Sequence, residues 1–371
     1  MIPLAVPDLR GAEIELLTQC VRDNWVSSAG PFVKELEAKV AALAGCSHGI
    51  ATSSGSLALQ LMLTGHGIGP RDRVIVPAWT FAATINAVIH SGAEPMLVDI
   101  DQYSWTLDPA LVAEALAADR ERRIKAVIAV DVLGHTADFD RLREACPPGR
   151  AYLFEDAACT IGAHYRGRPA GGLCDAGTFS FNGNKTVTAG GGGMVVTSSA
   201  EKAERMRHLS QQARKGARYQ HDAAGFNFRM PNINAALGLA QLARLDEMLA
   251  RKSQIAKTYD ALLANNATLR PMPRPDWGDD SCWLYSAVAK DEASALALID
   301  FLRDRGIESR LFWEDLTQQE TYARYPSLMR GVAAGLSGRV LSLPSSSGLT
   351  DAELDQVCAA LSLWLERDMA A

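Results

Sequence analysis

The feature that most constrains the fold is the alternation of short apolar runs with helical patterns over the first two thirds of the 371 residues. Val127–Val130 is entirely apolar, as expected for a strand buried on both faces of a mostly parallel sheet. The predicted strands are Gly49–Thr52, Arg73–Pro77, Glu94–Val98, Ile124–Val130, Ala151–Glu155, Gly177–Phe181 and Gly192–Thr197. Helical patterns lie between several of them, at Phe32–Leu43, Ser56–Gly65 and Phe81–Ser91. Such repeated β–α units predict a doubly wound α/β domain.

The pattern changes after Pro231. We predict one long helix over Asn234–Leu263 and a Pro/Gly linker over Pro271–Gly278. A smaller α+β domain follows, with predicted elements at Trp283–Ala289 (strand), Ala293–Arg305 (helix), Ile307–Arg310 (strand) and Asp351–Arg367 (helix). Because the chain is long for one hydrophobic core, we expect two domains that share a cleft, residues 1–245 and 246–371.

Composition and charge argue against several classes of protein. A net charge of −6 without a long Lys/Arg run argues against nucleic-acid binding. No apolar stretch is long enough for a membrane span, and the N-terminus does not resemble a secretion signal. The seven cysteines and seven histidines show no CxxC, HxxxH or HExxH spacing. We therefore expect a cytoplasmic enzyme without a metal, a membrane partner or a nucleic-acid partner.

A strand that leads into a single lysine and a glycine run is the strongest candidate site. Thr178–Phe181 is followed by a polar turn with Lys185 and then by the glycines Gly190–Gly193. A loop lysine is usually a solvated surface charge, but glycines here permit close approach of a ligand. A lysine that forms a Schiff base must be partly desolvated, so that its amine is neutral and nucleophilic. Lys185 is therefore the candidate nucleophile.

Two further residues follow predicted strands, where ligands bind in parallel α/β sheets. Asp156 comes after the apolar run that begins at Ala151. It is either the N-cap of the next segment or a buried carboxylate that keeps a pyridinium nitrogen protonated. Phe81 follows a strand that ends at Pro77. Its ring is either part of the core or a platform for a flat cofactor.

A serine–glycine turn at a helix start predicts an anion site. Ser54, Gly55 and Ser56 lie between a predicted strand and a predicted helix. Backbone N–H groups, hydroxyls and the helix dipole attract a phosphate at such a place. Ser180, on the strand before the candidate lysine, could add another hydroxyl. Plain N-capping by Ser54 or Ser56 is the alternative.

Together these motifs resemble the sugar aminotransferases of the DegT/DnrJ/EryC/StrS family, a branch of the fold-type I pyridoxal-phosphate enzymes. The resemblance extends over essentially the whole chain. It implies an α/β fold with a mixed, mostly parallel sheet in a large domain and a smaller C-terminal α+β domain. The motifs that carry it are Ser54-Gly-Ser, Pro77–Thr84, Val98-Asp-Ile-Asp with Thr106-Leu-Asp-Pro, Glu155-Asp-Ala-Ala, Phe179-Ser-Phe-Asn-Gly-Asn-Lys and Gly225-Phe-Asn-Phe-Arg-Met-Pro-Asn-Ile-Asn-Ala-Ala.

The resemblance implies a role for each candidate residue. Lys185 would hold pyridoxal 5′-phosphate covalently and move the proton, Asp156 would pair with the pyridinium nitrogen, and Phe81 would stack on the ring. The other cofactor contacts would come from Ser54, Gly55, Ser56, Cys159, Ser180 and Asn227. The sugar nucleotide would meet Trp25, Ser27, Arg229 and Arg310. Asn227 and Arg229 would reach the neighbouring subunit's site, so the resemblance implies a homodimer with composite active sites.

Two departures from the family pattern stand out. Cys159 occupies a position, near the cofactor's phenolic oxygen or the substrate, where relatives often carry His, Gln or Glu. It is either a cofactor contact or a filler. The run Gly190–Gly193 lacks a Glu that many relatives have. The motif context looks most like the members that aminate carbon 4 of a nucleotide-linked 4-keto-6-deoxy sugar, with glutamate as the donor, for surface polysaccharide or glycan synthesis.

Three alternatives remain. A 3-keto sugar nucleotide could be the acceptor instead. A sugar 3-dehydratase of the same fold would carry a histidine in place of Lys185, so the lysine speaks against it. A non-catalytic regulator that retains the fold would have no need for Lys185, Asp156 and the Ser54-Gly-Ser turn together.

Overall fold

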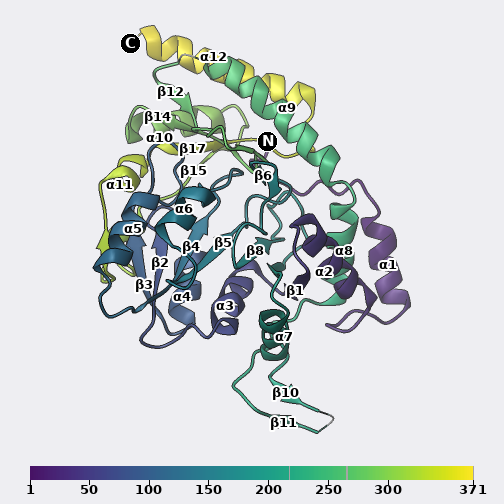
Figure 1. The fold of residues 1–371 in the computed structure, drawn as a ribbon. Coiled ribbons are helices and arrows are strands. Elements are labelled where there is room, and N and C mark those ends of the chain that lie inside the picture. Colours follow the sequence, from purple (N-terminus) through teal and green to yellow (C-terminus); the bar gives the residue numbers. More distant parts are fainter. Residues whose placement is uncertain (217, 265, 371) are drawn as a thin grey trace.

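The computed structural model describes residues 1–216, 218–264 and 266–370, and a large eight-stranded sheet forms the middle of the molecule (Figure 1). Its strand order is β1-β9-β8-β5-β4-β2-β3-β16. The β1–β9 and β9–β8 pairs are antiparallel and all the other pairs are parallel, which confirms the expected mixed, mostly parallel sheet. The strands are β1 (His48–Thr52), β2 (Arg73–Pro77), β3 (Glu94–Val98), β4 (Ile124–Val130), β5 (Tyr152–Asp156), β8 (Ala176–Ser180), β9 (Gly193–Thr197) and β16 (Ser327–Leu328).

Alternate residues of the central strands pack against helices on opposite faces of this sheet. Val127 of β4 belongs to a cluster with α5 and α6, while Ile128 belongs to a cluster with α3 and α4. A strand buried on both faces needs apolar residues at every position, and this explains the apolar run. The helices before β10 are α1 (Glu13–Arg22), α2 (Pro31–Leu43), α3 (Gly55–Gly65), α4 (Ala83–His90), α5 (Pro109–Ala118), α6 (Phe139–Ala145) and α7 (Ala200–Leu209).

Three smaller sheets complete the strands. An antiparallel sheet in the C-terminal part has the order β12 (Leu269–Pro271), β14 (Tyr285–Ala289), β17 (Val340–Leu343) and β15 (Arg310–Leu311). A second combines β13 (Gly278–Asp279), β6 (His164–Tyr165) and β7 (Arg168–Pro169). The third is the hairpin β10 (Arg214–Lys215) and β11 (Gln220–His221), which projects from the body beyond α7 (Figure 1).

The long helix predicted over Asn234–Leu263 is wrong, because the structure has two helices there. They are α8 (Asn232–Leu242) and α9 (Leu245–Leu263), separated at Ala243 and Arg244. Arg244 Nη2 lies 3.3 Å from Asp8 Oδ2 and 2.9 Å from Glu247 Oε1. The contact with Asp8 ties the break to the N-terminal segment, and the local helical pattern does not reveal it.

The remaining helices belong to the C-terminal part of the chain. They are α10 (Glu292–Arg303), the 3-10 helix η1 (Leu316–Gln318), α11 (Val332–Leu336) and α12 (Asp351–Ala370), which lies beside α9 along the outside of the molecule (Figure 1). The short strand predicted at Ile307–Arg310 begins later, at Arg310, because Ile307 forms a bridge with Ile2 instead. A separate core of α9, α10, α12 and the small sheet lies in this part.

One buried carboxylate ties the C-terminal part to the large sheet. Asp99, directly after β3, accepts hydrogen bonds of 2.7–3.0 Å from the backbone N–H groups of residues 330–333, at the start of α11. β16 also comes from this part of the chain and pairs with β3. The predicted division into residues 1–245 and 246–371 stays a prediction, and these contacts join segments from both sides of it.

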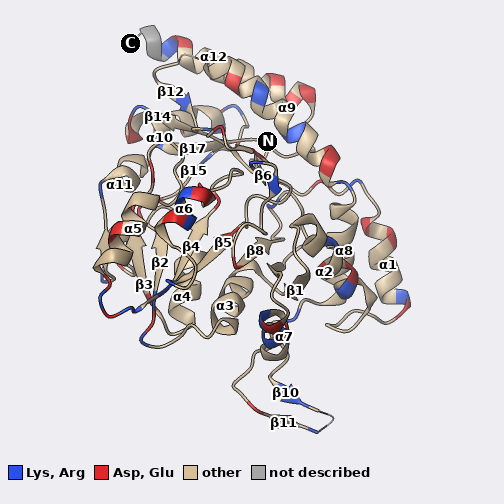
Figure 2. Ribbon diagram, in the orientation of Figure 1, with Lys and Arg blue, Asp and Glu red and all other residues tan. Residues whose placement is uncertain are grey.

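Charged side chains of both signs are spread over the outer helices, notably along α9 and α12 (Figure 2). Among the described residues, no helix is both long and apolar enough to span a membrane.

Candidate active site

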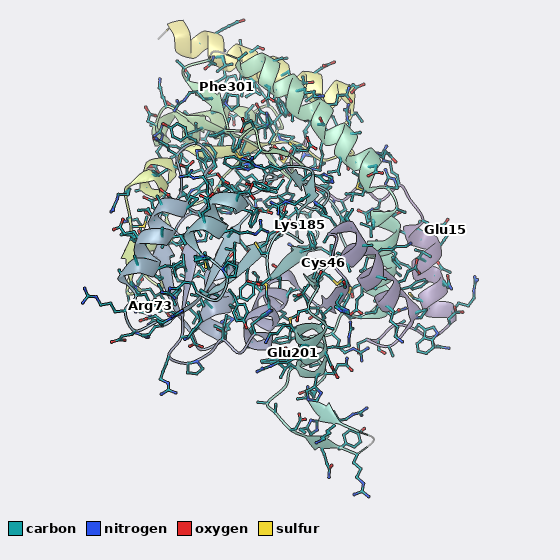
Figure 3. The ribbon with its side chains drawn as sticks, viewed as in Figure 1. Glu15, Cys46, Arg73, Lys185, Glu201 and Phe301 are labelled. Atoms are coloured by element: carbon teal, nitrogen blue, oxygen red, sulfur yellow. The ribbon has the colours of Figure 1, made fainter. Side chains whose placement is uncertain are left out.

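Lys185 lies near the middle of the molecule, in the loop between β8 and β9 (Figure 3). Its Nζ atom donates a hydrogen bond of 3.4 Å to Cys159 Sγ. The same atom lies 3.5 Å from the centre of the Trp283 ring. A thiol from the loop after β5 and an indole from the segment before β14 therefore meet at one amine. This partly sheltered place is the environment that a nucleophilic lysine requires.

Asp156 is the last residue of β5 and is buried. Its Oδ2 accepts a hydrogen bond of 2.7 Å from the Thr84 hydroxyl, and its Oδ1 accepts one of 3.2 Å from the backbone N–H of Ala158. Burial raises the pKa of Asp156, and these hydrogen bonds and the charge of Lys185 oppose the rise. Along the described chain the next helix after β5 is α7, so Asp156 is not a helix N-cap. A buried carboxylate without an ion pair in the described residues is suited to a cationic ligand group.

Cys159 is 8% exposed and faces the same amine. Burial raises the pKa of its thiol, and the charge of Lys185 acts in the opposite direction. The backbone oxygen of Cys159 accepts a hydrogen bond of 3.0 Å from Ser281 Oγ. The thiol is therefore a neutral, weakly polar wall beside the lysine, held by a residue of the C-terminal part.

The serine–glycine turn begins α3, as the sequence predicted, and it packs closely on two strands. Ser54 Oγ accepts a hydrogen bond of 3.2 Å from the backbone N–H of Leu57, so Ser54 is an N-cap. A Cβ atom on Gly55 would lie 2.9 Å from Ser180 Cβ and 3.0 Å from its Oγ. A Cβ atom on Gly193 would lie 2.5 Å from the Ser54 oxygen. The two glycines therefore let this turn reach the end of β8.

Four of the other candidates come from two loops that contact each other. Arg229 Nη2 donates a hydrogen bond to the backbone oxygen of Ser28, and the Ser27 oxygen accepts one of 2.6 Å from Asn232 N. Trp25, 45% exposed, lies in the same loop as Ser27. The Asn227 side chain is exposed. The structure thus brings the segment 227–229 against the loop 25–30.

The segment 227–229 also runs beside the serine–glycine turn. Ser53 N donates a hydrogen bond of 2.8 Å to the Phe228 oxygen, and Arg229 forms a bridge with Thr52. The exposed Ser56 lies in the first turn of α3. Candidates for binding phosphate and candidates for binding sugar nucleotide therefore occupy one edge of the large sheet.

Two candidates stand outside these clusters. Phe81 follows β2 and is 63% exposed, so the interpretation as a core residue is wrong. Arg310 lies on β15 and is exposed, and its Nη2 donates a hydrogen bond of 3.0 Å to Glu308 Oε1. No contact in the described part of the chain joins Arg310 to Lys185 or Asp156.

Sequence reasoning missed three residues of this site. Thr84 binds Asp156, Ser281 binds the Cys159 backbone, and Trp283 covers Lys185. Thr84 ends a motif that was recognised without a role for this hydroxyl. Ser281 and Trp283 lie about a hundred residues further along the chain than Lys185, and no local pattern links them to it.

Glu155, which precedes Asp156, has a structural role. Its two oxygens accept hydrogen bonds of 2.6 Å from Gly171 N and 3.0 Å from Leu173 N. Burial raises the pKa of Glu155 to about 7. Because neighbouring residues of a strand point to opposite faces, one carboxylate of the pair anchors a loop while the other faces the site.

Comparison with known proteins gives one consistent result. The sequence model of the DegT/DnrJ/EryC1/StrS aminotransferase family matches residues 7–362. The chain is 39% identical over 367 residues to the GDP-perosamine synthase of Caulobacter vibrioides, covering 97% of each chain. Among solved structures it is similar to DesV of S. venezuelae, with a TM-score of 0.90 and 32% identity over 98% of this chain and 100% of that one. It is also similar to a putative sugar aminotransferase of Streptococcus pneumoniae in its PMP form, with a TM-score of 0.92 and 25% identity over 99% and 100%.

Enzymes of that family use pyridoxal 5′-phosphate, and the side chains found here fit it. Lys185 would supply the amine for the cofactor's aldehyde. Asp156 supplies a buried carboxylate, which can pair with a pyridinium nitrogen. The backbone N–H groups and the exposed Ser56 at the start of α3, next to Ser180, would hold the cofactor's phosphate.

Proposed function

The chain belongs to the DegT/DnrJ/EryC1/StrS aminotransferase family, and we propose that it transfers an amino group from glutamate to carbon 4 of a nucleotide-linked 4-keto-6-deoxy sugar. That it is a sugar-nucleotide aminotransferase dependent on pyridoxal 5′-phosphate follows from its family and relatives. The observation that carries the assignment of residues is the meeting of Lys185, Cys159 and Trp283 close to the buried carboxylate of Asp156.

Each residue of the site has a separate task. When bound, pyridoxal 5′-phosphate supplies the electron sink that lets an amino group pass between substrates. Lys185 holds the cofactor and carries the proton on Nζ, because this atom already lies in a sheltered position. Asp156 holds the pyridinium proton, and Thr84 orients its carboxylate. Cys159 and Trp283 keep bulk water from the amine.

The cofactor phosphate is proposed to lie at the start of α3, against Gly55, Ser56 and Ser180. There the helix dipole and free N–H groups favour an anion. Phe81 is proposed to stack on the ring, and its exposure in the cofactor-free chain supports this because a core phenylalanine is usually buried.

The sugar assignment rests on the relatives and the motif context. A relative that shares 39% of its residues over nearly the whole chain is named a GDP-perosamine synthase, which supports a GDP-linked sugar as the first acceptor to test. Trp25, Ser27 and Arg229 are proposed to meet the nucleotide diphosphate, because their loops contact each other beside the start of α3. Arg310 would have to leave Glu308 to join them.

A homodimer with composite active sites is part of the proposal. Asn227 has an exposed side chain beside the serine–glycine turn, so a second copy of the chain can meet it there. A two-fold axis makes such a contribution reciprocal.

The test is a panel of GDP-, UDP- and dTDP-linked 4-keto-6-deoxy sugars with glutamate and other amino donors, with products identified by mass spectrometry and NMR. Amination at carbon 4 with glutamate supports the proposal. Lys185→Ala should abolish turnover, while Lys125→Ala, at an exposed lysine of β4, serves as the matched control. Amination at carbon 3, or equal rates with sugars that lack a nucleotide, would contradict the substrate assignment.

A further inference from the structure

Trp283 lies two residues before β14 of the small sheet, yet it contacts the loop that carries Lys185. It is 4% exposed, and its ring centre lies 3.5 Å from Lys185 Nζ. Its Nε1 donates a hydrogen bond of 2.8 Å to the backbone oxygen of Asn184, the residue directly before the lysine. The indole therefore contacts the lysine loop twice, once through its π face and once through its N–H.

Other groups hold the indole in this orientation. The ring of Phe312 meets it nearly edge-on at 6.2 Å between ring centres. The neighbouring backbone is hydrogen-bonded to the loop after β4. Ser281 N donates a hydrogen bond of 2.9 Å to the Gly134 oxygen, and Leu284 N donates one of 3.2 Å to the Leu133 oxygen. The segment 281–284 is thus a strap from the C-terminal part that lies across the lysine loop.

A buried lysine completes the support. Lys252 of α9 donates from Nζ to the backbone oxygens of Trp283 at 3.0 Å, Ser345 at 2.8 Å and Cys282 at 3.4 Å. Burial lowers the pKa of Lys252 to about 8. A buried amine with three carbonyl partners fixes the backbone at that point, because losing the amine would leave those carbonyls unsatisfied.

We propose that Trp283 is a positioning residue that holds the ammonium group of Lys185 on its indole face when the lysine is not bonded to the cofactor, and that Lys252 fixes Trp283 there. This proposal rests on the assignment of Lys185 as the cofactor lysine. The amine has to leave and rejoin the cofactor in each cycle, and a π face accepts it without the lasting ion pair that a carboxylate would form. Trp283 is thereby the link through which the C-terminal part controls the catalytic amine.

The first experiment needs no cofactor. The cofactor-free protein is labelled with a trace of acetic anhydride, and peptide mass spectrometry measures how much each lysine is acetylated. The quantity compared is the labelling of Lys185 relative to that of the exposed Lys125, the internal reference. Trp283→Leu should raise relative labelling of Lys185 by about two- to thirtyfold, the range that a cation–π contact predicts. Trp283→Phe keeps a ring and should fall between Trp283→Leu and the wild type. Trp364→Leu, a tryptophan of α12 packed on Phe301, is the matched control and should leave the ratio unchanged.

The second experiment uses the enzyme with cofactor. Trp283→Leu should lower kcat about tenfold or more and change the KM for the sugar nucleotide less than about twofold, because the lost contact positions the lysine and not the substrate. Lys252→Met, of similar length, should raise Lys185 labelling in the same direction as Trp283→Leu. It keeps the proposal testable if Trp283→Leu does not fold.

Two results would overturn the proposal. One is unchanged Lys185 labelling in folded Trp283→Leu and Lys252→Met. The other is a fall in kcat/KM of these variants that comes entirely from a higher KM, with kcat unchanged. Failure of the proposed function is distinct, because it would appear as full activity in Lys185→Ala whatever the labelling of the Trp283 variants.

Discussion

Replacing Asp156 by asparagine should separate the stability of the protein from its activity. The side chain keeps its shape but loses its charge. In the structure Asp156 is buried and binds the Thr84 hydroxyl at 2.7 Å and Ala158 N at 3.2 Å. An asparagine can keep both contacts, since its oxygen accepts from the Ala158 N–H and the Thr84 hydroxyl can accept from its amide. The change therefore removes a buried charge while keeping both contacts of the side chain.

The sign of the effect on stability follows from the direction of the pKa shift. Burial raises the pKa of Asp156, so in the cofactor-free protein the folded state holds this proton to higher pH than the unfolded state does. The stabilisation is complete below the ordinary aspartate pKa, about 4, and is lost as the pH rises through the folded-state pKa. Above it the buried charge opposes folding. At pH 7 Asp156→Asn should thus raise the free energy of unfolding of the cofactor-free protein, by about 1.4 kcal/mol for each unit by which burial raises the carboxyl pKa.

The activity should change in the opposite direction. Without the negative charge the pyridinium proton is lost and the ring is a weaker electron sink, so turnover should fall about 10²- to 10³-fold. The assay is chemical unfolding of cofactor-free protein at pH 5 and pH 7, with steady-state kinetics of the loaded enzyme. Asp246→Asn, at an exposed position of α9, is the control. A variant that is less stable than the wild type at pH 7, or that keeps full turnover, would refute this reasoning.

Three further predictions concern the phosphate turn, the thiol and the dimer. Gly55→Ala should weaken cofactor binding about 10- to 100-fold in an equilibrium titration, because its Cβ atom would lie 2.9 Å from a serine side chain. Gly335→Ala, which has open space around its Cβ, is the control and should bind the cofactor normally. Equal affinities of the two variants would contradict the placement of the phosphate. Cys159→Ala should keep turnover within about tenfold of the wild type, since a neutral thiol is a weak acceptor, and a loss as large as that of Lys185→Ala would make the thiol a catalytic group. Mixing inactive Lys185→Ala with an inactive Asn227→Ala protein should restore activity in the mixed dimer, and an active monomer in sedimentation would exclude composite sites.

Local patterns predicted the large sheet well, because its strands are buried on both faces and need apolar residues at each position. β2, β3 and β4 have the predicted bounds, β5 and β8 are each displaced by one residue, and β9 begins one residue later than predicted. The two-residue strand β16 was not predicted. The loop that carries Lys185 was also predicted from local sequence, because a strand, a polar turn and a glycine run follow one another along the chain. The glycine run predicted close approach of a ligand, and in the structure the backbone of Ser54 approaches Gly193.

Contacts between distant segments were beyond such patterns. The break between α8 and α9 depends on Arg244 meeting Asp8, some 236 positions earlier in the chain. The sequence predicts Trp283 as the start of a strand, but β14 begins at Tyr285 and the Trp283 ring lies on Lys185 instead. The anchoring of residues 330–333 on Asp99 was equally hidden, because a motif shows which residues recur and not which backbone groups they bind.

The central claim is that Lys185 holds the cofactor. Borohydride reduction of the protein loaded with pyridoxal 5′-phosphate fixes the cofactor to the lysine that binds it, and peptide mass spectrometry then locates the added mass. We predict a single modified peptide that contains Lys185, and loss of that modification when glutamate is added first, because the amino donor displaces the lysine. Modification of another lysine instead, or no modification of a protein that binds the cofactor and turns over its substrate, would contradict the account.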